Sequence, residues 1–265
     1  FWQSKLATPE TSSWDTSSVT TMNQTFLGAL KVNPNTSNWN TENVTNMTYM
    51  FAFARDAQMV VSSWDVSKVT NISYMFYRTK LGVVDEIVQG VTVGADFDRV
   101  PNYAEINNSF SNWNTSCVNT MDTMFRESVI DPNTTDWDTS NVTTLKSMFY
   151  QNNFADPDVA NWVTSKVTNM YSIFYQAEEA NPDVTGWDTA KVEDMYGTFY
   201  KASKANPDLS NWNFSIVDLD NNKLNHFLTN TAITCANKQK FLEAADSTAP
   251  VPAGGTVVQP MITAP

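Results

Sequence analysis

The chain is poor in the residue types that build most catalytic and metal sites. It contains one histidine, His226, and two cysteines, Cys117 and Cys235, among 265 residues. Zinc sites built on paired histidines, four-cysteine metal sites and a disulfide framework are therefore excluded. The motifs G-x-S-x-G, G-x-x-x-x-G-K-S/T and G-x-G-x-x-G are also absent from the sequence, so the common nucleophile, nucleotide and cofactor sites are missing. We expect a non-enzymatic protein with no cofactor.

Basic residues and long apolar runs are scarce as well. The chain has 16 Lys and Arg residues and 28 Asp and Glu residues, which gives a net charge of −12, and charged residues make up 17% of the chain. Phosphate binding needs a basic surface, so we expect no nucleic-acid partner. No window of 18 apolar residues occurs, which predicts no membrane span. The start at Phe1 fits either a processed mature chain or a chain trimmed at this end.

Tryptophan marks an internal repeat that organises the chain. Eight of the nine tryptophans keep one register, with steps of 25, 25, 49, 24, 25, 25 and 25 residues. The sequence that begins at each Trp has the consensus W-D/N-T-S-x-V-T-x-M-x-x-M-F-Y-x-A. Five of these tryptophans have a proline five residues before them: Pro34, Pro132, Pro157, Pro182 and Pro207. One such unit is too small to bury its own Trp, Met and Phe, so stacked units must cover one another's apolar faces.

The 49-residue step contains an extra segment without Trp, with Gly82, Gly90, Gly94 and a β-rich run over 87–93. We expect it to loop out of the stack, where repeat proteins often carry contacts; a surface loop without a role is the alternative. The predicted organisation is an N-terminal cap over 1–13, repeats over 14–77, the insertion over 78–109, repeats over 110–216, a C-terminal cap over 217–246 and an extended tail over 247–265.

Within a unit, apolar spacing predicts a short strand followed by a short helix or turn. Val159, Trp162 and Thr164 have the L-x-x-L-x-L spacing of a strand that faces the core. The apolar residues at positions 5, 8, 12 and 15 after Trp have helical spacing. The predicted fold class is an α/β solenoid, a leucine-rich-repeat-like stack with one inserted loop and a C-terminal helical cap.

Two segments carry a family resemblance: residues 161–170, with the text NWVTSKVTNM, and residues 64–76, with WDVSKVTNISYMF. They resemble the repeat of BspA-type leucine-rich-repeat surface proteins, and the similarity covers roughly residues 9 to 216 apart from the insertion. The resemblance implies a right-handed solenoid and a secreted or surface-anchored protein that works in adhesion, matrix binding and host or cell contact. No catalytic residue carries over from the family.

The residues directly after Trp form a polar ladder, if each Trp lies in a strand. Carboxylate and amide groups of this kind suit hydroxyl-rich glycans or Ca²⁺, and the ligand-face candidates are Asp15, Asn40, Asp65, Asn114, Asp138, Asp188 and Asn213. The alternative is that these side chains cap local turns and bond along the stack. No D-x-D-x-D-G loop is present, and no metal site is predicted.

The motif N-x-S/T marks ten glycosylation candidates: Asn23, Asn35, Asn43, Asn46, Asn71, Asn107, Asn114, Asn133, Asn141 and Asn213. A chain rich in Asn, Ser and Thr also generates the motif by chance, and the repeat consensus itself creates it at Asn43 and Asn141. Among these candidates we expect Asn107 above all to be exposed, because it lies in the insertion.

The cysteines and the tail bear on assembly. Cys117 and Cys235 lie four repeats apart, roughly 19 Å along a regular stack, whereas a disulfide needs Cα atoms within about 7 Å. An intrachain disulfide would need the C-terminal segment to fold back, so we expect buried thiols, with an interchain link as the alternative. Proline and glycine predict an extended or flexible tail, whose alternative role is strand addition to a neighbouring subunit's edge; the assembly candidates are Val257, Val258, Met261 and Ile262.

The sequence favours a secreted or cell-surface, non-enzymatic repeat protein, a structural or adhesive component of an extracellular assembly such as a glycosylated fibre. Its expected partners are other copies of itself, other extracellular proteins, and glycans. The first alternative is a carbohydrate-binding module that uses the polar ladder. The second is a polysaccharide-active enzyme, since paired carboxylates for such chemistry are available in the composition.

Overall fold

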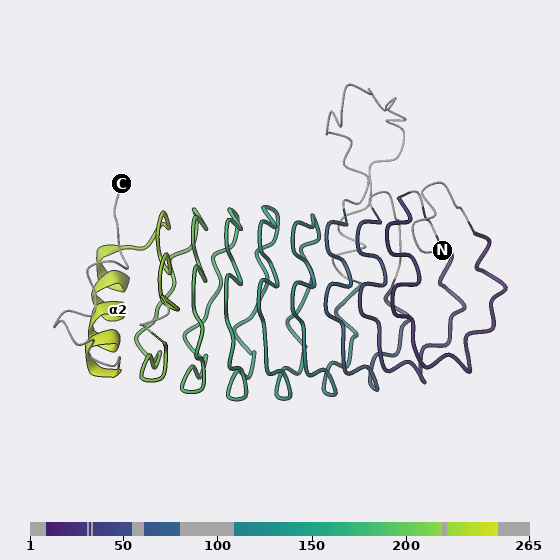
Figure 1. Cartoon of the computed structure of the whole chain (residues 1–265), viewed down its shortest axis with the longest axis horizontal. Helices are drawn as coiled ribbons and strands as arrows, with labels where there is room; N and C mark the ends of the chain where they lie inside the picture. Colours follow the sequence, from purple (N-terminus) through teal and green to yellow (C-terminus); the bar gives the residue numbers. More distant parts are fainter. Residues whose placement is uncertain are drawn as a thin grey trace, which may run out of the picture.

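The computed structural model describes residues 9–30, 32, 34–54, 61–79, 109–218 and 222–248. In these residues the chain winds into successive turns that stack in one row along the longest axis of the molecule (Figure 1). We number the turns 1 to 8 by the Trp that heads each, Trp14, Trp39, Trp64, Trp113, Trp137, Trp162, Trp187 and Trp212, and count positions from this Trp as zero. Most of the predicted insertion (80–108) and of the tail (249–265) lies outside the described residues.

Parallel backbone pairing joins adjacent turns along one edge. Single bridges connect position 7 of successive turns, from Thr21↔Asn46 through to Asn169↔Asp194. Beyond the bridge, amide groups continue to donate to the next turn, as from Phe174 N to the Thr198 carbonyl at 2.8 Å. The paired segment follows Trp by seven residues, so the pairing does not lie at Trp, where the strand was predicted.

Two residues in each of turns 1 to 7 have left-handed backbone conformation, at positions 10 and 14. In turn 6 they are Ser172, with φ of 53°, and Gln176, with φ of 54°. Left-handed conformation costs residues with a side chain about 1–2 kcal/mol. Interturn hydrogen bonds offset this cost, because Ser172 N donates to the Tyr196 carbonyl at 2.8 Å and Gln176 N to the Tyr200 carbonyl at 2.6 Å. The helical spacing after Trp thus corresponds to tight non-helical turns, and α2 is the one α-helix of the described residues.

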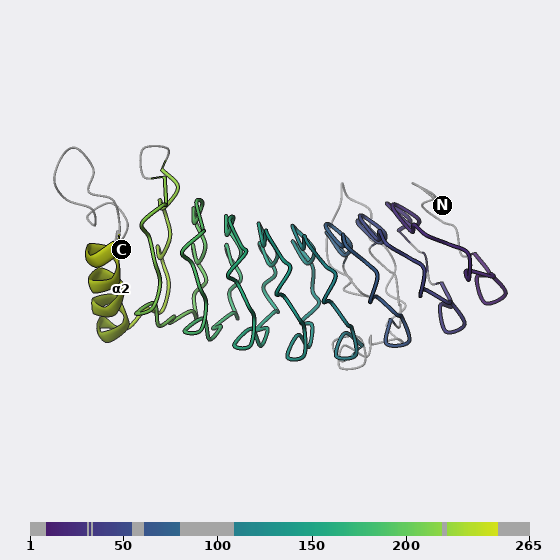
Figure 2. The same ribbon diagram turned by 90° about the horizontal axis from the view of Figure 1, so that it is seen from below.

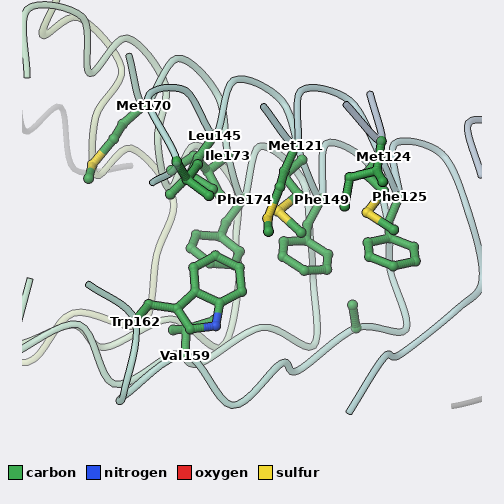
Figure 3. Packing of buried hydrophobic residues seen from close by; sticks show 14 of the residues in the cluster. Met121, Met124, Phe125, Leu145, Phe149, Val159, Trp162, Met170, Ile173 and Phe174 are labelled. Carbon is green, nitrogen blue, oxygen red and sulfur yellow. The ribbon is translucent and has the colours of Figure 1, made fainter. Parts of the chain in front are cut away.

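The core consists of rows of identical aromatic rings. Trp137 and Trp162 stack with ring centroids 6.4 Å apart and planes within 2°, and Phe149 and Phe174 stack at 5.7 Å and 1°. Figure 3 shows the phenylalanine row with the methionines beside it. Aromatic pairs contribute about 0.5–1.5 kcal/mol each beyond the burial of their area, so every added turn extends the same core.

The stack continues directly across the 49-residue step. Phe76 of turn 3 and Phe125 of turn 4 stack at 5.6 Å with planes within 4°. Asn71 and Thr120 form the parallel bridge between the same two turns. Turns 3 and 4 are therefore neighbours in space.

Side chains, in place of backbone pairing, join the turns near Trp. Thr139 and Thr164, both at position 2, donate their hydroxyls to the carbonyls of Val163 and Asp188 in the next turn, at 3.1 and 2.9 Å. Val163 N donates back to Thr139 Oγ1 at 2.7 Å. These threonines are buried, so their hydroxyls join the turns from the core side.

The turns lie closer together at one edge than at the other. Between turns 5 and 6 the ring centroids are 6.4 Å apart in the Trp row and 5.7 Å apart in the Phe row, and Tyr150 and Tyr175 are 4.6 Å apart. All three ring pairs are parallel within 4°, so their separations report the local spacing of equivalent positions. The described turns consequently follow an arc (Figure 2), with Tyr150 and Tyr175 on its inner edge.

Helix α2, Cys235–Thr248, covers the C-terminal end of the stack (Figure 1). Its Phe241 packs against Phe214 at 5.5 Å and Phe227 at 5.7 Å between ring centroids. The preceding Thr234 donates its N–H to Asn206 Oδ1 at 2.8 Å, which ties the helix to turn 7. Within the segment predicted as a C-terminal cap, residues 222–230 form turns and the helix itself begins at Cys235.

Candidate binding face

Aromatic side chains line one part of the described surface in two rows. Position 13 is Tyr in turns 3, 5, 6 and 7 and Arg in turn 4, and position 9 is Tyr in turns 6 and 7. We define the tyrosine face as these residues and the histidine next to them: Tyr77, Arg126, Tyr150, Tyr175, Tyr200, Tyr171, Tyr196 and His226. The histidine is exposed and the other seven side chains are half-buried, so the face is accessible to a partner.

The first row is continuous over turns 3 to 8. Tyr175 stacks on Tyr150 and on Tyr200, each at 4.6 Å between ring centroids. The Arg126 guanidinium lies 4.2 Å from the centroid of Tyr150 and 5.6 Å from that of Tyr77, which extends the row by cation–π contacts. At the other end His226 meets Tyr200 edge-on at 5.3 Å.

The second row runs beside the first over turns 5 to 8. Tyr171 and Tyr196 stack at 5.2 Å, and Lys146 Nζ lies 5.4 Å from the centroid of Tyr171. Tyr196 also meets His226 edge-on, at 5.7 Å. The two rows therefore converge on the single histidine of the chain.

Backbone geometry explains why Tyr follows Phe so often in the repeat. In turn 6, Phe174 is fully buried while Tyr175 is half-buried, because neighbouring residues between the two left-handed positions project to opposite sides. Gly197 has φ of 58°, and a Cβ there would lie 3.1 Å from Tyr175 Cδ2. The glycine thus leaves room for the Tyr175 ring against turn 7.

Positive charge gathers at this face although the chain is acidic. Lys201 Nζ lies 5.2 Å from the centroid of Tyr200, and Arg78 lies beside Tyr77 at 5.3 Å. Glu127 pairs with both arginines, at 2.5 Å from Arg78 Nε and 3.1 Å from Arg126 Nε. This shared carboxylate fixes the orientation of the Arg126 side chain under Tyr150.

Burial shifts the pKa of two tyrosines in the first row, Tyr150 and Tyr175. Burial, followed by the neighbouring Tyr150 and Tyr200, raises the pKa of Tyr175 to about 12. Burial also raises the pKa of Tyr150, although the Arg126 charge opposes the shift. The phenol groups of Tyr150 and Tyr175 are therefore neutral at neutral pH and can donate hydrogen bonds.

The predicted ligand-face residues lie in one row at position 1, but their side chains cap turns. Each accepts, through Oδ1, the backbone N–H two residues later, as Asp138 does from Ser140 at 2.9 Å and Asn40 from Glu42 at 3.0 Å; the others are Asp15, Asp65, Asn114, Asp188 and Asn213. Hydrogen bonds to the following serines lower the pKa of Asp15, Asp65 and Asp138. This geometry matches the turn-capping alternative.

The glycosylation candidates fall into two groups. Asn43 and Asn141 donate Nδ2 to the carbonyls of Ser17 and Ser116 in the preceding turn, at 3.0 and 2.7 Å. A glycan on that nitrogen would compete with the interturn bond, so these two sites are poor acceptors. Asn23, Asn35 and Asn114 are exposed, the remaining described candidates, Asn46, Asn71, Asn133 and Asn213, are half-buried, and Asn107 lies outside the described residues.

The prediction of buried thiols was wrong, since Cys117 and Cys235 are both exposed and free. Cys117 occupies position 4, where Lys166 and Lys191 of turns 6 and 7 are also exposed, and Cys235 begins α2. The assembly candidates Val257, Val258, Met261 and Ile262 lie outside the described residues. Within the described part of the chain no three His, Cys, Asp or Glu residues are grouped to hold a metal ion, and no helix there has the length and apolarity to cross a membrane.

Sequence reasoning missed the tyrosine face although its signal was present. The apolar spacing predicts a helix across the repeated Phe-Tyr pair, and in a helix two neighbouring residues do not project to opposite sides. In the tight turns that the structure shows there, the same pair places Phe174 in the core and Tyr175 at the surface. A search for polar aromatic residues directly after each core Phe finds the four tyrosines of the first row, Tyr77, Tyr150, Tyr175 and Tyr200.

A family model described as "Mycoplasma protein of unknown function, DUF285" matches residues 1–83, 96–212 and 128–234, more than half of the chain. The chain belongs to this family. The overlap between the two later DUF285 matches fits a sequence built of similar repeats. No curated protein and no solved structure matches the chain.

Proposed function

We propose that this DUF285 chain is a non-enzymatic solenoid of the leucine-rich-repeat type, secreted or held at a cell surface, and that it acts as an adhesive component of an extracellular assembly. The observation that carries the proposal is the tyrosine face, which runs unbroken from turn 3 to turn 8 on the inner edge of the arc. Stacked-repeat proteins bind through extended concave surfaces, and Tyr and Arg are enriched where proteins make contact. The resemblance to BspA-type repeats supports the same role.

The rest of the described surface offers less for recognition. The polar ladder at position 1 is engaged in turn caps. The exposed large apolar side chains, Phe154, Val163 and Ile216, stand in three different turns and form no row. A carbohydrate-binding role that relies on Asp65, Asp138 and Asp188 therefore loses its main support.

Helix α2 bears on how the chain would assemble. Its exposed residues are Cys235, Ala236, Gln239, Glu243, Asp246 and Ser247, a mainly polar outer surface of the kind that terminal units of stacked repeats need for solubility. If two copies met at the C-terminal end of the stack, they would contact each other through α2. Strand addition by the tail to an edge of a neighbouring subunit stays a prediction.

A bead-adhesion assay tests the proposal. Beads carrying the whole chain are counted on extracellular matrix laid down by cultured cells, and compared with beads carrying the variant Tyr150→Ser with Tyr200→Ser. The matched control, Asp65→Asn with Asp188→Asn, changes two residues of the opposite edge. Thermal unfolding of all three proteins verifies that they are folded.

We expect the native chain and the control to adhere equally, and the tyrosine variant to lose most adhesion. Equal adhesion of the two variants would contradict a contact role for the face. If only the control lost adhesion, the polar ladder and not the tyrosine face would be the contact surface.

A further inference from the structure

We propose that the tyrosine face binds a linear anionic polysaccharide, one that bears carboxylate or sulfate groups, laid along the two aromatic rows. This inference rests on the proposed function and names the chemistry of its ligand. It draws on the regular spacing of the rows, on the local charge, and on the hydrogen-bonding groups of the face.

The spacing of the face favours a ligand that is itself a repeating polymer. Tyr150, Tyr175 and Tyr200 present one phenol group per turn, at intervals of 4.6 Å between rings. Tyr171 and Tyr196 repeat the pattern at 5.2 Å in the adjacent row. These intervals are close to the length of one extended sugar residue, so successive sugars can meet the same groups in successive turns.

The charge of the face favours an acidic polymer over a neutral one. Across positions 9 to 14 of turns 1 to 7 the charged residues are Arg78, Arg126, Lys146 and Lys201 against Asp122 and Glu127, a sum of 4 − 2 = +2, whereas the whole chain carries −12. Glu127 is engaged by the two arginines, and Asp122 accepts the Thr144 hydroxyl at 2.6 Å. A polyanion repelled by the rest of the surface would be directed to this strip.

The hydrogen-bonding groups of the face are suited to carboxylates and sulfates. The phenol of Tyr175, with its raised pKa, is a donor at neutral pH. Arg126 is fixed between two rings and Glu127, so its guanidinium needs little ordering to meet an anion. Lys146 and Lys201 lie against the ring rows and add ammonium groups at both rows.

The test measures binding of the whole chain to polygalacturonate, heparin and neutral dextran by isothermal titration calorimetry at two salt concentrations. The charge variant is Lys146→Gln with Lys201→Gln. The matched control, Lys166→Gln with Lys191→Gln, removes the same charge from position 4 of turns 6 and 7, where both lysines are exposed. A third variant, Tyr175→Phe, removes one phenol hydroxyl and keeps the ring stack.

We expect one or both polyanions to bind, with affinity that falls as salt rises, and dextran to give no heat. The charge variant should bind about tenfold or more weakly, the control as the native chain does, and Tyr175→Phe in between. Equal loss in the control, or binding of dextran as tight as that of the polyanions, would overturn the inference.

Two outcomes separate this inference from the proposed function. If no glycan binds while Tyr150→Ser with Tyr200→Ser still abolishes adhesion of beads to matrix, the face is a contact surface for a different partner and the polysaccharide assignment is wrong. If the native chain self-associates in sedimentation analysis and the charge variant does not, the occupant is a second copy of the chain. If no glycan binds and the variant Tyr150→Ser with Tyr200→Ser adheres as the native chain does, both proposals fail.

Discussion

The Trp edge and the tyrosine edge of the same turns are built in different ways. At the Trp edge the rings are buried, 6.4 Å apart between turns 5 and 6, and the backbones are joined through buried threonine hydroxyls. At the tyrosine edge the rings are half-buried, 4.6 Å apart, and the backbones are paired directly. The same aromatic stacking therefore supports the core at one edge and furnishes a surface at the other. The difference in spacing curves the stack toward the surface.

Truncation of one ring at each edge gives the largest expected effect. Trp162→Ala removes a buried ring from the Trp row and should lower the free energy of unfolding by about 3–5 kcal/mol. Tyr175→Ala removes a half-buried ring and should cost about 1–2 kcal/mol. Urea unfolding followed by circular dichroism measures both. Equal losses would show that the tyrosine row is as much a part of the core as the Trp row.

The threonine hydroxyls of the Trp edge come next. Thr164→Val keeps the size of the side chain but leaves the Asp188 carbonyl without its donor, which should cost about 1 kcal/mol. Thr164→Ser retains the hydroxyl and serves as the control. Turn 3 has a buried Val66 at the equivalent position, so the fold tolerates the change, and a valine variant as stable as the native chain would refute the role of the hydroxyl.

Backbone strain at the tyrosine edge should respond to glycine. Gln176→Gly relieves left-handed strain in the folded chain, but glycine loses more conformational entropy on folding. We expect the free energy of unfolding to rise by about 0.5 kcal/mol. Gly197→Ala is the reverse change and should destabilise, since its Cβ would meet Tyr175. Thermal melts of both variants give the sign, and loss of stability in Gln176→Gly would show that position 14 is unstrained.

The smallest effect concerns the turn caps of the Trp edge. The hydrogen bonds to Ser140 lower the pKa of Asp138, so its contribution to stability is present above the pKa of the unfolded chain, about 3.9, and is lost as pH falls through the folded value. Asp138→Asn should remove this contribution, a few tenths of a kcal/mol at the surface. Urea unfolding between about pH 7 and about pH 3 measures it. An unchanged acid dependence would exclude Asp138 as a contributor.

The sequence predicted the repeat, its register and the membership of the core, because Trp, Met and Phe recur at fixed positions in a chain that needs stacking to bury them. It misplaced the paired segment, because residues such as Asn169 and Asp194, which form the bridges, are not typical of strands. It also missed the left-handed positions, since Ser172 and Gln176 are not residues that mark such a conformation. The tyrosine face depends on that geometry, so the sequence did not reveal it.

Chemical footprinting of lysines tests most directly whether the tyrosine edge is the surface that binds. The whole chain is acetylated under limiting conditions with and without polygalacturonate, and the modification of each lysine is measured by mass spectrometry. We predict protection of Lys146 and Lys201 and unchanged modification of Lys166 and Lys191. Protection of the latter pair, or uniform protection of all four, would contradict the division of the molecule into a structural edge and a binding edge.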